Sequence, residues 1–488
     1  MDEQKHEAEE QPVKPAGKYI QLKPFTFIMV LFLMIVITAG LTIFALTFGD
    51  ERVVEVKVPV ERSEFTHLYD AYDELKTKYY KEIDSDAVVN GAINGMFDAL
   101  GDPYTDYMNK DEAQSFNESL SSSFQGIGAE IQERNGYIMV VSPIKNSPAE
   151  AAGLQPRDLI LSVDGESIKG LNASEAVLLI RGEKGTKVVL EVQRGDNPEP
   201  LAFTIVRDDI PVETVYGELD EDNIAHVQIT SFSENTAKEL KTILADLDQQ
   251  GMTALVLDVR QNPGGYLEAA IEISNLFVEE GKNILQLQGR EGEAQVLVAD
   301  GGDKYTVPVT VLIDEGSASA SEILAAALSE SYGAKIIGVT SFGKGTMQEV
   351  SYFDDGSNLK FTTGKWLTPN GSWINETGIK PDVEVQYPPY AQLTYVDPST
   401  ELGVGTELEV VASAEGMLEA LGYNPGDVDH VYTAQTASAV KAFQADRALE
   451  QTGVVVNETT YALMDAIREK MQKEDPQLVE AKKLLTAE

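Results

Sequence analysis

Three serines alternate with alanines where the chain passes from an apolar run typical of a buried strand to one typical of a helix. The segment 316–322 reads G-S-A-S-A-S-E, with the strand-like run 307–313 before it and the helix-like run 323–328 after it. A serine on such a turn exposes its hydroxyl at the edge of a sheet. The free N–H groups at the helix start then point toward any anion that forms there. One of these serines could therefore act as a nucleophile.

A serine hydroxyl is a weak nucleophile until a base removes its proton. Of the 4 histidines, only His226 belongs to the same region, and a lone histidine in a strand is more often a core or face residue. The chain has 0 cysteines, which excludes thiol catalysis, cysteine-bound zinc and disulfides. Lysine is left as the base: Lys344 lies between Gly343 and Gly345. A lysine works as a base only when partial desolvation or hydrogen bonding lowers the pKa of its ammonium. Gln348 is neutral and could orient this amine without stabilising its charge.

Each of these residues also has an interpretation without chemistry. Serines before a helix are usually caps or turn residues, and a lysine between glycines is usually solvated. The segment 338–344 also matches the phosphate-binding pattern G-x-x-x-x-G-K. The next residue in that pattern must be Ser or Thr, whereas this chain has Gly345, and the run 347–353 is typical of a strand rather than a helix. Nucleotide binding is therefore disfavoured.

Together these motifs resemble the C-terminal processing (tail-specific) protease family of serine peptidases. In that family the lysine follows the serine by 25 positions and the glutamine follows the lysine by 4, which are the separations of residues 319, 344 and 348 here. The resemblance implies that Ser319 is the nucleophile, Lys344 the general base and Gln348 its orienting partner. Further matching segments are L-G-D-P-Y-T-D-Y at 100–107, D-V-R-Q-N-P-G-G at 258–265 and G-I-K-P-D at 378–382.

The resemblance also implies where the oxyanion of the reaction would be held. Its donors would be the backbone amide of Ala320 and one amide from the Gly264–Gly265 turn. No metal and no cofactor are implied. The reaction would be acyl transfer, with a tetrahedral oxyanion, an acyl-enzyme and its hydrolysis.

The composition of the chain limits the classes of partner that the protein can bind. The 488 residues suffice for several domains, at ~100 to 200 residues per domain. Lysine and arginine number 38 and aspartate and glutamate number 80, so the formal net charge is −42. Such a surface repels nucleic acid and anionic lipid, so nucleic-acid binding is disfavoured.

An uncharged stretch near the N-terminus predicts a single membrane-spanning helix. Residues 25–48 contain no charged side chain, and ~20 apolar residues span a hydrocarbon core of ~30 Å. Lys14, Lys18 and Lys23 precede the stretch, so residues 1–24 are expected to be a cytoplasmic tail and everything from Asp50 onward to lie outside the cell membrane. The apolar run continues without a clear cleavage site, which favours an uncleaved anchor over a signal peptide.

The residues that follow predict a helical part and then a small β-rich module. Apolar stripes at helical spacing predict helices over 63–115 that pack on the catalytic core. Short strands over 124–206 resemble a PDZ domain. In such domains a glycine-containing loop, here formed by Gln125, Gly126, Ile127 and Gly128, offers backbone N–H groups to the terminal carboxylate of a peptide.

Alternating strands and helices over 214–390 predict an α/β protease core, into which the resemblance inserts the PDZ domain. Residues 404–468 resemble a small all-α peptidoglycan-binding module with its A-V-x-x-F-Q helix. The usual Asp-Gly turns are replaced, so a packing or dimerisation module, and with it a homodimer, is the alternative. The tail 471–488 is expected to be a charged helix or disordered.

The sequence therefore predicts a membrane-anchored extracytoplasmic serine endopeptidase that cleaves proteins near their C-termini and recognises free C-termini through its PDZ domain. The alternative is a catalytically silent PDZ adaptor that tethers clients to the cell wall. Such an adaptor would need neither Lys344 nor Gln348. A serine-reactive probe that traps an acyl-enzyme would separate the two functions.

Overall fold

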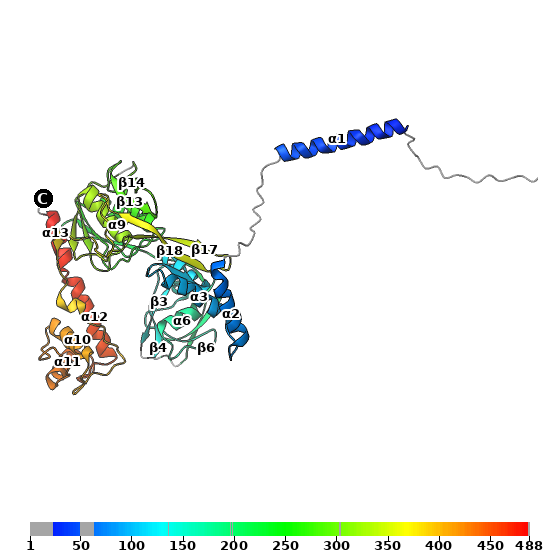
Figure 1. Ribbon diagram of the computed structural model, residues 1–488. Helices are drawn as coiled ribbons and strands as arrows, with labels where there is room; N and C mark the ends of the chain where they lie inside the picture. The colour runs from blue at the N-terminus through cyan, green and yellow to red at the C-terminus, as the bar shows by residue number, and fades with distance from the viewer. Residues whose placement is uncertain are drawn as a thin grey trace, which may run out of the picture. The chain divides into compact units, whose positions relative to one another are not determined.

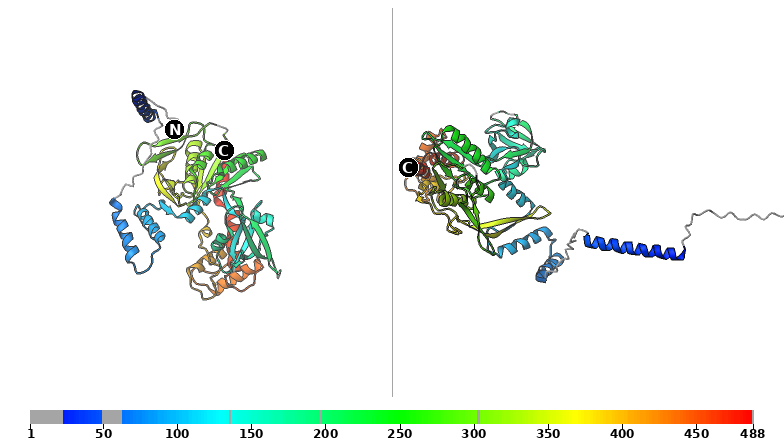
Figure 2. Two further views of the ribbon diagram at one scale, coloured as in Figure 1. Left: turned by 90° about the vertical axis from the view of Figure 1, so that its right-hand side faces the viewer. Right: turned by 90° about the horizontal axis from the view of Figure 1, so that it is seen from above.

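The computed structural model describes residues 23–48, 63–134, 136–195, 197, 199–301 and 304–486. The chain divides into two compact units, Met1–Asp84 and Ser85–Glu488. Figures 1 and 2 show the helices and strands of both units.

The first unit holds helix α1 (Pro24–Phe48), a short 3-10 turn η1 (Ser63–Phe65) and helix α2 (Thr66–Lys78). The stretch predicted to span the membrane is thus helical, with side chains described as far as residue 40. Within the described part of the chain, however, no helix has the combined length and apolarity that a membrane crossing requires. The predicted transmembrane helix is therefore not supported by the structure. Most of the predicted cytoplasmic tail, and Asp50, lie outside the described residues.

The second unit begins with two helices that flank a short strand. Helix α3 (Ser85–Asp98) leads to β1 (Asp106–Met108), and helix α4 (Lys110–Leu120) follows. Asn109 caps α4, because its side-chain oxygen accepts hydrogen bonds from the N–H groups of Asp111 and Glu112. The sequence pattern predicted only helices here. Strand β1 exists because it pairs with a distant strand, β18 (Asn358–Leu367), which local periodicity does not reveal.

The region predicted as a PDZ domain is an antiparallel sheet with two helices. Its strand order is β3-β4-β5-β7-β8, with β6 paired to β5. The elements are β3 (Ala129–Arg134), β4 (Tyr137–Pro143), α5 (Pro148–Ala152), β5 (Leu159–Val163), β6 (Glu166–Ser167), α6 (Ala173–Ile180), β7 (Lys187–Gln193) and β8 (Leu201–Val206). Strands β2 (Ser123–Gly126) and β9 (Asp208–Pro211) pair where the chain enters and leaves this region.

The protease core is built on a six-stranded sheet of order β10-β11-β12-β15-β16-β19. Strands β10 and β11 are antiparallel, and the other neighbours are parallel. The strands are β10 (Val215–Leu219), β11 (Ile224–Ile229), β12 (Ala254–Asp258), β15 (Val309–Ile313), β16 (Lys335–Gly338) and β19 (Val383–Glu384). The connecting helices are α7 (Thr236–Gln250), α8 (Leu267–Ser274) and α9 (Ala320–Ala327), which continues into a π-helical turn, η2 (Leu328–Tyr332).

Alternate residues of these strands pack on opposite faces of the sheet, as the period of two in a strand requires. Leu255, Leu257 and Val311 pack with the side chains of α7, α8 and α9. Val256 and Leu312 belong to a separate cluster with the helix at the C-terminal end of the described chain. The sheet is therefore covered by helices on both faces.

That second cover is helix α13 (Pro476–Thr486), where the sequence predicted a charged helix or disorder. Asp475 caps it by accepting a hydrogen bond from the Leu478 N–H. The guanidinium of Arg260 donates to Asp475 at 2.7 Å and to Asp258, at the end of β12, at 2.6 Å. Burial by itself would raise the pKa of Asp258, but hydrogen bonds from His226 and Arg260 outweigh burial and lower that pKa to about 2. His226 is thus engaged in a structural hydrogen-bond cluster with Asp258.

A second sheet contains the strand that follows Lys344. Its order is β1-β18-β13-β14, with β17 paired to β18. The strands not yet bounded are β13 (Asn283–Gly289), β14 (Gln295–Val298) and β17 (Thr346–Tyr352). Because β17 begins two residues after Lys344, this sheet fixes the backbone on the C-terminal side of the predicted base.

A three-helix module with its own apolar core stands between the protease core and α13. Its helices are α10 (Glu409–Ala420), α11 (Ala434–Asp446) and α12 (Glu458–Lys473), and the short turn η3 (Pro389–Gln392) leads into it. The carboxylate of Glu415 is buried and accepts hydrogen bonds from the Thr436 hydroxyl at 2.6 Å and the Asp429 N–H at 3.0 Å. The predicted all-α module is confirmed as a helical unit.

Candidate active site

The three serines of the predicted nucleophile turn lie between β15 and α9 in different environments. The Ser317 hydroxyl donates to the Val259 carbonyl at 2.8 Å, and the Ser321 hydroxyl donates to the Asn262 carbonyl at 2.8 Å. Both side chains are fully buried. Ser319 is only half-buried and adopts φ +55°, which non-glycine residues rarely do. Geometry alone thus singles out Ser319 as the serine that a substrate could reach.

A buried carboxylate, Glu322, joins the serine turn to the lysine loop. Its Oε2 accepts hydrogen bonds from the N–H of Ser319 at 2.8 Å and from the N–H of Lys344 at 2.9 Å. Its Oε1 accepts from the Ser341 hydroxyl at 2.6 Å and from the Gly343 N–H at 2.7 Å. One oxygen atom therefore holds the backbones of both predicted catalytic residues. Sequence reasoning missed this role, since a glutamate there also fits the first turn of a helix.

The Gly-Lys-Gly loop is packed closely against the segment that leads to the G-I-K-P-D motif. A Cβ on Gly343 would lie 2.8 Å from the amide nitrogen of Gly378, and a Cβ on Gly345 would lie 2.8 Å from that of Asn375. Both positions therefore require glycine. The carbonyl of Lys344 accepts a hydrogen bond from the Trp366 indole at 2.8 Å. The lysine backbone is fixed on both sides.

The side chain of Lys344 is half-buried, and its surroundings favour the neutral amine. Burial lowers the pKa of Lys344, and the nearby charge of Lys360 lowers it further, against the opposing carboxylates of Glu322 and Asp102. The net pKa lies below the ordinary value of a lysine. This is the direction that a general base needs.

The loop before β1 supplies the other wall of the lysine site. The Lys344 Nζ lies 4.9 Å from the centroid of the Tyr104 ring. Asp102, in the same loop, accepts hydrogen bonds from the Tyr104 N–H at 3.0 Å and the Thr105 hydroxyl at 2.7 Å. The sequence marked this segment only as a family match, and gave no sign that it reaches Lys344.

Gln348 lies on β17 but does not hold the lysine amine in this structure. Its amide nitrogen donates to the Thr346 hydroxyl at 2.8 Å and lies 3.5 Å from the Thr362 hydroxyl. Among the described residues, no hydrogen bond joins Gln348 to Lys344, or the Lys344 amine to Ser319. The orienting role of Gln348 stays a prediction.

The two predicted sources of oxyanion donors lie next to each other. A Cβ on Gly264 would lie 2.9 Å from Ser319 Cβ and 3.0 Å from the Ala320 nitrogen, so the glycine turn contacts the serine turn directly. The Gly264 N–H is already donated to the Asn262 side chain at 2.9 Å. The N–H groups of Ala320 and Gly265 have no hydrogen-bond partner among the residues that the structure describes. Of the two glycines, Gly265 is therefore the one with an amide available.

The predicted carboxylate-binding loop lines a small pocket of about 80 Å³ in the PDZ-like region. Gly126, Ile127 and Gly128 face side chains of α6 there, Val177 and Ile180 among them. The carbonyls of Ile127 and Gly128 accept hydrogen bonds from other backbone N–H groups of this region. Their own N–H groups have no partner within the described residues.

Gln125 belongs to this loop but does not line the pocket, and its side-chain oxygen accepts a hydrogen bond from the Lys184 N–H at 3.2 Å. Arg181, at the end of α6, forms an ion pair of 2.8 Å with Glu118 of α4 and stacks on the Phe124 ring at 4.8 Å. The PDZ-like region is thus tied to the helix that precedes it.

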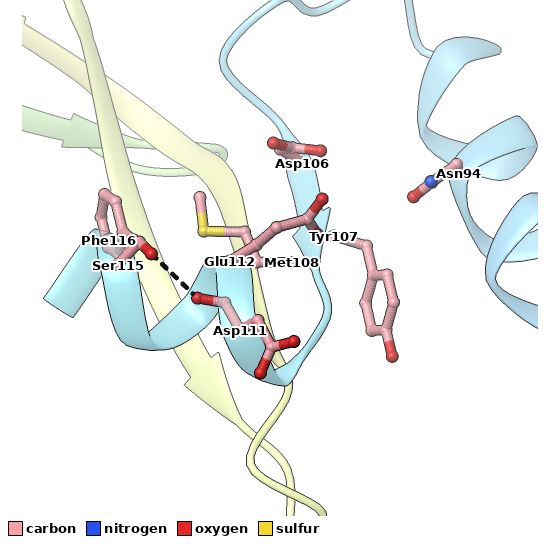
Figure 3. Close-up of a pocket in the computed structure, with 8 residues that line it drawn as sticks. All are labelled: Asn94, Asp106, Tyr107, Met108, Asp111, Glu112, Ser115 and Phe116. Atoms are coloured by element: carbon pink, nitrogen blue, oxygen red, sulfur yellow. Dashed lines mark hydrogen bonds between the residues drawn. The ribbon is translucent and has the colours of Figure 1, made fainter. Parts of the chain in front are cut away.

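A larger pocket, of about 530 Å³, lies elsewhere, between α3, β1 and α4. Figure 3 shows its lining residues, with the hydrogen bond from the Ser115 hydroxyl to the Asp111 carbonyl. Neither Ser319 nor Lys344 is among them. Throughout the described ranges, no group of histidine and carboxylate side chains is arranged to hold a metal ion.

Four family models match successive parts of the chain. A model of peptidase family S41 matches residues 223–385, and a PDZ-domain model matches 139–194. A model of the N-terminal domain of the activating protease CtpB matches 47–112, and a model of a putative peptidoglycan binding domain matches 408–463. They fall in the order that the sequence motifs predicted.

Curated relatives match almost the whole chain. The carboxy-terminal processing protease CtpA of Bacillus subtilis is 45% identical over 468 residues, which cover 96% of this chain and 99% of that protein. CtpB of the same organism is 41% identical over 420 residues, covering 85% of this chain and 88% of the relative. Among solved structures, a photosystem II D1 C-terminal processing protease is similar at 28% identity and a TM-score of 0.40, covering 66% of this chain and 86% of its own.

Proposed function

Since this chain belongs to the carboxy-terminal processing proteases of peptidase family S41 and is a serine peptidase, we propose that Ser319 and Lys344 form its catalytic dyad and that it cleaves proteins near their C-termini. The observation that carries the proposal is the shared hydrogen bonding of Glu322, whose single oxygen accepts the N–H groups of both residues. An adaptor without chemistry would have no use for this arrangement.

The reaction follows from the groups around Ser319. The neutral amine of Lys344 takes the hydroxyl proton as Ser319 Oγ bonds to the carbonyl carbon of the scissile peptide bond. The resulting oxyanion accepts hydrogen bonds from the N–H groups of Ala320 and Gly265. The Lys344 ammonium then gives its proton to the leaving amine, and an acyl-enzyme remains. Water, deprotonated by the same amine, hydrolyses the ester and restores Ser319.

The dyad is tested by Ser319→Ala and Lys344→Ala in the full chain. Each variant should lose peptidase activity while its unfolding curve stays close to that of the wild type. The double variant should be no less active than either single one, because residues that act as a unit are not additive. Lys335→Ala is the matched control, because Lys335 pairs with Asp382 on the surface, and it should keep its activity. Near-normal turnover by Lys344→Ala would refute the dyad.

A serine-reactive phosphonate provides a second readout that does not depend on knowing the natural substrate. The probe should label the wild type at Ser319 and leave Ser319→Ala unlabelled. An adaptor would show no such labelling. Labelling at another serine would overturn the assignment of the nucleophile.

We propose further that the loop 125–128 recognises the free carboxylate of a substrate. The N–H groups of Ile127 and Gly128, which have no partner among the described residues, lie beside a small apolar pocket and support this role. The net charge of −42 repels acidic peptides, but screening over ~10 Å weakens that repulsion relative to contact hydrogen bonds. A peptide with an apolar C-terminus should therefore bind and be cleaved better as the free acid than as its amide. Equal binding and cleavage of both forms would contradict carboxylate recognition.

We propose that residues 404–468 bind peptidoglycan, which co-sedimentation of the protein with purified cell walls would test; a protein that stays in solution would leave packing or dimerisation as the role of the module. Under that alternative, sedimentation equilibrium would detect a homodimer. We also propose, from residues 25–48 and the lysines before them, a membrane-anchored enzyme with its catalytic part outside. Degradation of the catalytic part by protease added to intact protoplasts would support this placement, and full protection would refute it.

A further inference from the structure

The loop between α3 and β1 places the aromatic ring of Tyr104 beside Lys344. The two residues are 240 positions apart in the sequence. The Asp102 side chain closes the loop through its hydrogen bonds to the Tyr104 N–H and the Thr105 hydroxyl. The Thr105 hydroxyl in turn accepts the Thr362 N–H at 3.1 Å. Strand β1 then pairs with β18 in a fixed register, with Asp106 opposite Lys360. The Tyr104 backbone is therefore anchored to the sheet beside Lys344.

We propose that Tyr104 is a positioning residue for the general base: its ring covers the Lys344 amine and keeps water from it. The geometry consists of a half-buried lysine whose Nζ lies 4.9 Å from the ring centroid, on a ring carried by an anchored loop. This proposal rests on the proposed function, in which Lys344 removes the proton of Ser319. No part of it requires the ring to touch the substrate.

Charged groups face Lys344 from each element packed around it. Glu322 of α9 and Asp102 of the tyrosine loop favour the ammonium, whereas Lys360 of β18 opposes it, and Gln348 of β17 is neutral. Burial outweighs each of these charges and is the main reason that the pKa of the amine is lowered. The face of an aromatic ring also attracts an ammonium. Because burial is the largest influence on the pKa of this lysine, we expect the entry of water after loss of the Tyr104 ring to outweigh the loss of the attraction between the ring and the ammonium.

The aromatic ring of Tyr104, and not its hydroxyl, should keep water from the Lys344 amine. Among the described residues the Tyr104 hydroxyl has no hydrogen-bond partner. Burial raises the pKa of this phenol, and the charges of Glu322 and Asp102 raise it further, so it stays protonated where the enzyme works. Tyrosine and phenylalanine should thus be equivalent at this position.

The test compares pH profiles of kcat/KM for the full-length wild type, Tyr104→Phe and Tyr104→Ala. Tyr104→Phe should keep the wild-type acid limb. Tyr104→Ala should move that limb to higher pH by about one unit, so that activity near neutral pH falls about tenfold while the rate at high pH recovers toward the wild type. A merely structural role would lower the rate at every pH without moving the limb.

A matched control comes from the neighbouring tyrosine. The Tyr107 ring packs against Phe353, with centroids 6.5 Å apart, so Tyr107→Ala should perturb the same segment without moving the acid limb. Unfolding curves accompany every variant. Should Tyr104→Ala fail to fold, Tyr104→Gln brings a polar group of intermediate size to the same place and should also move the limb upward.

The proposal is overturned if the acid limb of Tyr104→Ala, or of Tyr104→Gln in its place, coincides with that of the wild type. It is also overturned if Tyr104→Phe moves the limb as far as the alanine variant does. Its failure is distinguishable from that of the proposed function. An inactive Lys344→Ala with an unmoved limb in Tyr104→Ala refutes only the shield, whereas an active Lys344→Ala refutes the base itself.

Discussion

Replacing Glu322 by glutamine should test whether its hydrogen bonds hold the backbones of Ser319 and Lys344 in place. The carboxylate is fully buried and accepts four hydrogen bonds, two on each oxygen. Glutamine keeps one accepting oxygen and places an NH₂ group where the other stood, so that two donors lose their acceptor and face another donor. We therefore expect Glu322→Gln both to destabilise the protease core and to loosen the backbones of Ser319 and Lys344.

The size of the loss follows from these contacts. Two hydrogen bonds to a charged group contribute about 1.5–3 kcal/mol each, and relief from burying a charge offsets part of this. A net loss of about 3 kcal/mol in the free energy of unfolding is expected, which lowers the melting temperature of a region of this size by about 6–12 °C. Misplacing the reacting groups by about 1 Å costs on the order of 10²-fold in rate.

The assay combines denaturant unfolding with peptide cleavage measured at a temperature where the variant is folded. Glu330→Gln is the matched control: its carboxylate is exposed on the continuation of the same helix and accepts one hydrogen bond, from the Asn370 N–H at 2.7 Å. This control should change the free energy of unfolding by about 0.5 kcal/mol or less. The reasoning is refuted if Glu322→Gln unfolds like this control and cleaves at a rate close to the wild type.

Three further outcomes follow from the structure. The kcat/KM should rise with pH through the lowered pKa of Lys344. Lys360→Gln removes a like charge, so it should raise that pKa and move the acid limb of the pH profile to higher pH. An unmoved limb would show that the charge of Lys360 has no effect on the amine. Gly264→Ala should cut activity by on the order of 10²-fold with its circular dichroism spectrum retained, because φ is +101° and a Cβ would crowd the oxyanion donors; an active variant would contradict that placement. Asp475→Ala, which removes a partner of the largely buried Arg260, should lower the free energy of unfolding by about 3 kcal/mol, and an unchanged denaturation midpoint would show that the ion pair does not stabilise the fold.

The order of strands and helices in the core, and the residue types of the site, could be predicted from the sequence because their patterns are local. A run such as 307–313 followed by small residues and a second apolar run leaves few alternatives. Ser319 needed the spacing of a family to be chosen from the sequence. The structure supports the same choice, because the hydroxyls of Ser317 and Ser321 are used in buried hydrogen bonds.

What the sequence did not reveal depends on contacts between distant segments. The position of Tyr104 beside Lys344 requires the pairing of β1 with β18, and three residues are too few to mark a strand by pattern. The hydrogen bonds of Glu322 involve a loop about 20 positions away, which no helix periodicity encodes. Helix α13 looked like a charged tail because its apolar side chains have meaning only against the second face of the sheet.

The docking of α13 changes what the three-helix module is within the chain. The module leaves the protease core through η3 and returns to it through Asp475 and α13, so it is an insertion held at two points rather than an appendage on a single linker. A truncation after residue 390 would therefore remove the module and also strip an apolar face of the sheet, and insolubility of such a protein would say nothing about glycan binding. Excising the module alone, with a short linker from η3 to Asp475, would leave the sheet covered. A force applied to the module would likewise act on the ion pair between Asp475 and Arg260. Arg260 lies in the segment that leads to the Gly264–Gly265 turn.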